Sequence, residues 1–97
     1  MRIFEIIDKS GKIIYLTNER WGHINEEHPE IFLYLNYFED ILKNPTKIKV
    51  YECDESISYY YKYFKNRDAS AKYLLLIVKY LNGEAFIITA YFVRNIK

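Results

Sequence analysis

The chain contains a single cysteine, Cys53, and therefore cannot form an intramolecular disulfide. One cysteine also argues against a zinc site built from cysteines, and it suits a reducing compartment. Because 51% of the 97 residues are hydrophobic and 19% are aromatic, the chain can bury a core without disulfides or metals. This composition predicts one domain over residues 1–97.

Long apolar runs are also missing, since none approaches the roughly 20 residues that a membrane-spanning helix needs. The start, Met1 to Glu5, enters an alternating pattern at once and lacks the apolar core of a signal peptide. With only three glycines, the chain has no glycine-rich phosphate loop. No carboxylate cluster or Cys/His spacing indicates a catalytic metal. We therefore expect a cytoplasmic protein without membrane association, metal or other cofactor.

Net charge is low, at +1, and does not by itself indicate a nucleic-acid partner. The distribution is uneven, because residues 18–42 carry one arginine against six acidic residues, a net charge of −5. Residues 43–97 carry ten basic residues against five acidic ones, a net charge of +5. Either the neutral total hides a positive face on the sheet, or the charges simply solvate the surface.

Hydrophobic periodicity and turn residues predict the order of elements. Thr17 is suited to cap a helix, and Pro29 predicts a break because proline disfavours helical geometry at His28. Asn82-Gly83 is a strong hairpin signal. The expected strands are residues 2–7, 12–16, 47–53, 57–65, 72–81 and 85–93, and the expected helices end near residue 28 and span residues 30–43. We expect an α+β fold, with a short N-terminal hairpin preceding two helices packed on a twisted, mainly antiparallel four-stranded sheet.

The last strand has the most informative pattern of the chain. Alternation predicts one face formed by Phe86, Ile88, Ala90 and Phe92 and an opposite face with Thr89 and Tyr91. Two cations, Arg94 and Lys97, follow closely. A hydroxyl, a phenol and two cations suit anion binding, although an amphipathic strand with one half-solvated face is the simpler explanation.

The strand over residues 57–65 contains four tyrosines and Lys62. Alternation predicts one face with Tyr60, Lys62 and Phe64 and another with Tyr59, Tyr61 and Tyr63. Aromatic rings beside a cation suit base stacking and phosphate contact on RNA. Tyrosines also serve as half-buried strand residues, so both explanations remain open.

Both histidines lie near the first helix. A helical wheel puts Trp21, Ile24 and His28 on one face, and we expect Trp21 and Ile24 to anchor the helix to the sheet. His23 is turned about 200° from Trp21, toward solvent or a groove. Either histidine can act as an acid or base near neutral pH, or be an ordinary surface or capping residue.

Two segments together resemble a known family. Residues 20–30 read Arg-Trp-Gly-His-Ile-Asn-Glu-Glu-His-Pro-Glu, and residues 87–92 read Ile-Ile-Thr-Ala-Tyr-Phe before a final Ile96-Lys97. This pairing resembles the phage-type members of the barnase, EndoU, colicin E5/D and RelE (BECR-fold) superfamily of small metal-independent ribonucleases. The resemblance spans nearly the whole chain. It implies a toxin-type endoribonuclease that acts on RNA and is restrained by an antitoxin or other inhibitory protein.

The resemblance also implies individual site residues. The helix histidine would be His23, with His28 in the following His-Pro-Glu, and the threonine of the closing strand would be Thr89. The basic strand position would be Lys62, where arginine is more usual; lysine cannot make a bidentate contact to phosphate. The implied catalytic residues are His23, His28, Lys62 and Thr89, and the implied substrate-binding residues are Tyr60, Tyr91, Arg94 and Lys97.

Metal-free RNA cleavage uses the ribose 2′-hydroxyl as the nucleophile, and it needs a base, an acid and cations at the phosphorus. His23 or His28 would supply the acid or base. The alternative is a non-catalytic module of the same fold that binds a protein or RNA, and a weaker third hypothesis is a host-interaction protein on this scaffold. An apolar rather than basic open sheet face would favour protein binding.

Overall fold

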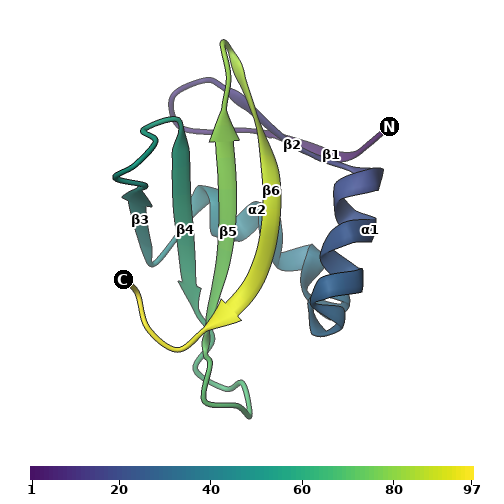
Figure 1. The fold of residues 1–97 in the computed structure, drawn as a ribbon, viewed down its shortest axis with the longest axis vertical. Coiled ribbons are helices and arrows are strands. Elements are labelled where there is room, and N and C mark those ends of the chain that lie inside the picture. Colours follow the sequence, from purple (N-terminus) through teal and green to yellow (C-terminus); the bar gives the residue numbers. More distant parts are fainter.

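The computed structural model describes residues 1–97 and places six strands in one sheet, in the order β1-β2-β6-β5-β4-β3 (Figure 1). All neighbouring strands are antiparallel except β2 and β6, which are parallel. No helix is both long and apolar enough to cross a bilayer. The strands are β1 (Arg2–Ile7), β2 (Ile13–Thr17), β3 (Lys47–Val50), β4 (Ile57–Tyr63), β5 (Tyr73–Tyr80) and β6 (Glu84–Val93).

The expected four-stranded sheet with a separate hairpin is wrong, because the N-terminal hairpin belongs to a mixed six-stranded sheet. Residues Ile13, Ile14 and Tyr15 of β2 pair in parallel with the first three residues of β6. Ile6 and Ile14 of the hairpin are buried in the common core, so the removal of these side chains from water favours pairing of the hairpin with the sheet. A parallel pair needs a long crossover, here most of the chain, so local sequence does not reveal it.

The helical segment has three parts: α1 (Asn18–Glu27), the 3₁₀ helix η1 (Pro29–Tyr37) and α2 (Phe38–Lys43). The Thr17 hydroxyl caps α1 by accepting a hydrogen bond from the Arg20 amide at 3.1 Å. His28 has φ −137° and ψ 73°, outside the helical region, as expected before proline. The predicted cap and the predicted break at Pro29 are therefore confirmed.

The single helix expected over residues 30–43 is wrong, because most of it is the 3₁₀ helix η1. The 3₁₀ repeat of three residues aligns side chains at positions i and i+3. Ile31 is buried, and the rings of Tyr34 and Tyr37 both pack edge-on against Phe64, with centroids 5.5 and 5.2 Å apart. Ile31, Tyr34 and Tyr37 are thus spaced by three residues, which matches the 3₁₀ repeat.

The helices cover one face of the sheet and leave the other face open (Figure 1). The core between sheet and helices is made mainly of large apolar side chains, each of which contributes roughly 1.5–3 kcal/mol on burial. It includes Ile6, Ile14, Leu16, Ile24, Ile31, Phe38, Ile41, Leu74, Leu76, Val78 and Ile87. In the figure α2 lies behind the strands, and α1 lies beside β6. The helix-covered face therefore forms the core, and the open face is the one that a ligand can reach.

The predicted hairpin at Asn82-Gly83 is confirmed. It joins β5 and β6, which pair along most of their length. The Leu81 amide donates to the Glu84 carbonyl at 2.7 Å, and Gly83 has φ +81°, a conformation that glycine adopts without steric cost.

Strict alternation along β6 is wrong, because a β-bulge interrupts the strand. Ile77 pairs with Thr89 and Val78 pairs with Ile87, which leaves Ile88 as an extra residue. As a result Ile87 and Ala90 both lie in the core. The expectation that Phe86 shares a face with Ala90 is therefore wrong.

Candidate functional site

Two rows of side chains run across the strands on the open face. Residues directly opposite each other in neighbouring strands point to the same face of a sheet. Each row begins with a lysine on β3 and ends with a hydroxyl-bearing residue on β6. The first row is Lys47, Tyr61, Leu75 and Tyr91, and the second is Lys49, Tyr59, Ile77 and Thr89.

His28 extends the first row beyond β6. Its imidazole ring stacks on the Tyr91 ring, with centroids 5.0 Å apart and planes at 24°. The His28 amide donates to the Ile24 carbonyl at 2.7 Å, and its carbonyl accepts from the Ile31 amide at 3.0 Å. Backbone hydrogen bonds thus fix the residue, and stacking orients its ring. This contact places an imidazole at the end of the row.

Burial changes the titration of the tyrosines in the first row. It raises the pKa of Tyr91 above the usual value near 10, and the neighbouring Tyr59 adds to the effect. Burial likewise raises the pKa of Tyr61. A protonated phenol can donate a hydrogen bond to a phosphate oxygen, and the half-buried Tyr91 at the end of the row is the candidate donor.

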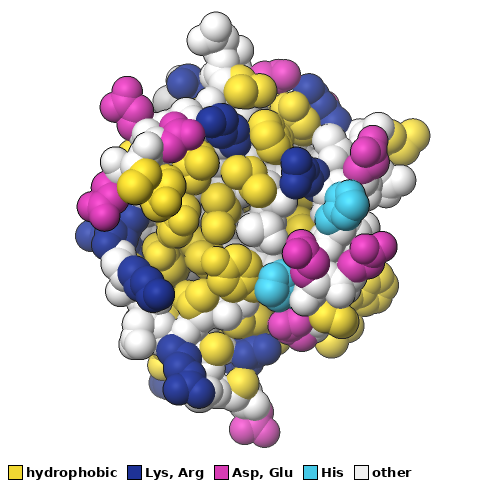
Figure 2. Space-filling view, in the orientation of Figure 1, with side chains coloured by type: hydrophobic (Ala, Val, Ile, Leu, Met, Phe, Trp, Pro, Cys, Tyr) yellow, Lys and Arg dark blue, Asp and Glu magenta, His cyan; other side chains and the backbone are white.

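Charged side chains from α1 lie along the margin of the open face. The Arg20 guanidinium carbon is 5.9 Å from the ring centroid of Phe86, whose ring is 6.2 Å from that of Tyr15. His23 is exposed and lies three residues after Arg20, at a neighbouring position on the helix surface. Figure 2 shows both histidines and several acidic side chains beside the apolar centre of this face.

Lys62 lies on the helix-covered face, which corrects the predicted site. It is directly opposite the buried Leu74. Its ammonium donates to the Asn44 carbonyl at 2.7 Å and pairs with the Asp40 carboxylate at 3.4 Å. The predicted site with Lys62 and Thr89 on one face therefore does not form, because the helices cover the face of β4 from which Lys62 emerges.

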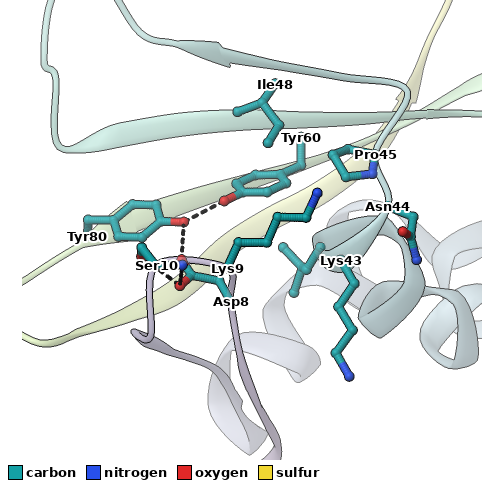
Figure 3. A pocket seen from close by; sticks show the side chains of 10 residues that line it. Asp8, Lys9, Ser10, Lys43, Asn44, Pro45, Ile48, Tyr60 and Tyr80 are labelled. Atoms are coloured by element: carbon teal, nitrogen blue, oxygen red, sulfur yellow. Dashed lines mark hydrogen bonds between the residues drawn. The ribbon is translucent and has the colours of Figure 1, made fainter.

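Tyr60 also lies on the helix-covered face, where it lines a concavity of about 550 Å³ (Figure 3). It is 5% exposed, and its hydroxyl is 2.5 Å from that of Tyr80, which donates to Asp8 at 3.1 Å. Burial opposes ionisation of Asp8, but hydrogen bonds from Ser10, the Lys12 amide and Tyr80 hold its pKa below the usual value. These polar groups satisfy one another and tie the β1–β2 loop to the sheet.

The remaining predicted substrate-binding residues follow β6. Lys97 reaches the open face, where it lines a second concavity together with Tyr59 and Tyr61. The Lys49 ammonium donates to the main-chain oxygen of Lys97. In Figure 1 the segment after β6 turns back toward β3 and β4. Arg94 is exposed directly after the strand.

Sequence reasoning missed several residues that the open face brings together. Lys47 and Lys49 alternate with Ile48 and Val50 in β3, so their shared face was visible in the sequence. Their position opposite Tyr61 and Tyr59 was not, because it depends on strand register. These two lysines lie on the open face, whereas Lys62 does not.

No three histidine, cysteine, aspartate or glutamate side chains form a group that could hold a metal ion. No protein-family model matches the chain, and neither a curated protein nor a solved structure matches it. The resemblance to BECR-fold ribonucleases therefore stays a prediction that rests on the two sequence motifs.

Proposed function

We propose that the protein is a metal-independent endoribonuclease that binds single-stranded RNA across the open face and cleaves it beside His28. The observation that carries this proposal is the His28–Tyr91 stack, which places an imidazole beside the half-buried Tyr91 at one end of a row whose other end is Lys47. Aromatic side chains stack on bases and lysines neutralise phosphates. The same contact brings together the His-Pro-Glu and Thr-Ala-Tyr motifs on which the resemblance depends.

In the proposed reaction the ribose 2′-oxygen attacks the adjacent phosphorus, and the bond from phosphorus to the 5′-oxygen of the next nucleotide breaks. The 2′-hydroxyl proton passes to a base, and an acid protonates the departing oxygen. The products are a 2′,3′-cyclic phosphate and a 5′-hydroxyl. His28, at the C-terminal end of α1, would carry out one of the two proton transfers. His23, exposed on α1, is the candidate for the other.

Other side chains of the open face would stabilise the negative charge that develops at phosphorus. Thr89 and the neutral Tyr91 hydroxyl donate hydrogen bonds to the non-bridging oxygens, and Arg20 contributes positive charge from α1. Lys47 and Lys49, on β3 at the opposite edge of the sheet, would bind phosphates of the RNA. These roles use only groups that lie on the open face or its margin.

The test is cleavage of single-stranded RNA by the purified protein in EDTA, with the products analysed for a 2′,3′-cyclic phosphate. His28→Ala should lower the rate by about 10²- to 10⁴-fold while the far-UV circular dichroism is unchanged. His23→Ala should also lower the rate, because His23 is the candidate for the second proton transfer, whereas Lys62→Gln on the helix-covered face is the control and should cleave as the wild type does. An absolute requirement for Mg²⁺, or full activity of His28→Ala, would refute the proposal.

A non-catalytic protein-binding module is the second candidate, and the apolar centre of the open face favours it (Figure 2). Ile77, in the middle of the second row, is half-buried and contributes to this centre, whereas Leu75 is buried. A contiguous apolar area on a surface is typical of a protein-binding site. RNA binding that is absent or insensitive to salt would favour this candidate over the nuclease.

As a toxin-type ribonuclease, the protein would act in the cytoplasm and need an antitoxin or other inhibitory protein. This part of the proposal is supported by the phage-type motifs. Induced expression of the wild-type chain should arrest bacterial growth, and His28→Ala expressed to the same level should not. Equal growth of the two strains would argue against toxicity through RNA cleavage.

A further inference from the structure

The concavity at the β3 side of the open face has the composition of a nucleobase pocket. Its volume is about 360 Å³, and three tyrosines, two lysines and one glutamate line it: Tyr51, Tyr59, Tyr61, Lys49, Lys97 and Glu52. The rings of Tyr51 and Tyr59 are parallel within 7°, with centroids 5.7 Å apart, and the Tyr61 ring is 6.4 Å from that of Tyr59. Aromatic surfaces beside cations suit a stacked base and its phosphate.

Tyr51 and Tyr59 form the accessible part of the aromatic wall, because Tyr61 is only 2% exposed. Tyr51 stacks on Tyr59 with one side of its ring and is 39% exposed, so the other side of the ring is a surface on which a base can stack. Tyr61 lines the pocket and belongs to the same row as Tyr91, two strands away. At about 4.8 Å per strand this separation is roughly 10 Å. Adjoining nucleotides of an extended strand can span that distance.

Glu52 gives the pocket a chemical preference. It is exposed and takes part in none of the ion pairs of the chain. An ionised carboxylate accepts hydrogen bonds but donates none, and it pairs well with the amino group of a base such as cytosine. The pairing edge of uracil has one N–H between two carbonyl oxygens, and a carboxylate repels those oxygens.

We propose that this pocket binds a nucleobase with an exocyclic amino group, in a nucleotide neighbouring the cleaved phosphodiester, and discriminates against uracil there. The inference deepens the proposed function, because it rests on single-stranded RNA crossing the open face. The base preference itself does not require His28 or cleavage, so binding alone can test it.

The test uses short fluorescein-labelled 2′-O-methyl homopolymers of A, C and U. These strands have no free 2′-hydroxyl and cannot be cleaved by the proposed reaction, so fluorescence anisotropy measures binding alone. The wild-type protein should bind A and C strands about tenfold more tightly than U strands. Tyr51→Leu should weaken A and C binding about tenfold. Tyr37→Leu, which removes an exposed tyrosine from η1, is the matched control and should leave binding unchanged.

Glu52→Gln is the second variant. Because Glu52 is exposed, the substitution should leave the fold unchanged. It should remove the preference for C over U while total binding is kept or strengthened, because a negative charge near the phosphates is removed. A preference that survives in Glu52→Gln would overturn the assigned role of the carboxylate. Wild-type affinities in Tyr51→Leu, or no binding by the wild-type protein, would overturn the pocket itself.

These outcomes are separable from those for the proposed function. If His28→Ala abolishes cleavage while the pocket variants bind as the wild type does, the pocket inference fails and the ribonuclease stands. If the wild-type protein cleaves nothing but the pocket variants lose binding as described, the pocket stands and the catalytic proposal fails.

Discussion

The imidazole ring of His28 lies against the phenol ring of Tyr91, with centroids 5.0 Å apart and planes at 24°. One residue comes from the junction of α1 and η1, and the other from β6. A stacked aromatic pair contributes about 0.5–1.5 kcal/mol beyond its buried area. The contact therefore holds the imidazole at the edge of the open face.

Tyr91 should act through two separable properties, its ring and its hydroxyl. Tyr91→Phe keeps the ring that orients His28, so the NMR signals of the imidazole should stay close to those of the wild type. RNA cleavage should still fall by about tenfold to a hundredfold, because the phosphate then has one hydrogen-bond donor fewer. Tyr91→Leu should also shift the His28 signals. Equal His28 spectra in Tyr91→Leu and the wild type would contradict the orienting role.

The two lysines of β3 should control the salt dependence of RNA binding. Replacing both Lys47 and Lys49 with glutamine should reduce the slope of log affinity against log salt by about 0.7 for each phosphate that is no longer neutralised. Lys62→Gln is the matched control, since it removes one lysine from the opposite face. Its RNA binding should equal that of the wild type, and the free energy of unfolding should fall by about 0–1 kcal/mol because the ion pair with Asp40 is broken. An equal decrease of RNA affinity in Lys62→Gln would contradict the assignment of faces.

The hydroxyl of Tyr80 should stabilise the fold without affecting RNA binding. Tyr80→Phe leaves the Tyr60 hydroxyl and one Asp8 oxygen without a partner on the helix-covered face. The free energy of unfolding should therefore decrease by about 1–2 kcal/mol, as measured by urea denaturation. Tyr37→Phe removes an exposed hydroxyl and should change nothing. A Tyr80→Phe protein as stable as the wild type would contradict this role of the hydroxyl.

Asp54 should make stability depend on pH in the acid range. Hydrogen bonds from the Ser56 hydroxyl and amide, and then from Lys79, lower the pKa of Asp54 to about 2. The unfolded chain titrates near 3.9. Because the folded pKa is the lower one, the stabilisation is complete above about pH 4 and disappears as the pH falls toward about 2. The difference in unfolding free energy between wild type and Asp54→Asn should shrink over that range. A difference that stays constant from about pH 5 to about pH 2 would contradict the shift.

Local signals in the sequence determined the parts of the fold that depend on neighbouring residues. The hydroxyl of Thr17 can cap only the helix that follows it, and Pro29 restricts only the residue before it. Asn82-Gly83 likewise specifies a turn between the strands on either side. The helix start, the break and the last hairpin were therefore predictable.

The tertiary structure alone decided which side chains form the candidate site. In β4, alternation yields one set with Tyr59 and Tyr61 and another with Tyr60 and Lys62, and both sets mix aromatic and polar character. The helices, docked on residues distant in sequence, cover the second set, and the bulge at Ile88 aligns Thr89 with Ile77 and Tyr59. A shift of one residue in register reverses the face of every following side chain. Burial against distant elements fixes that register, and this is why the sequence predicted the strands but assigned the cation to the wrong face.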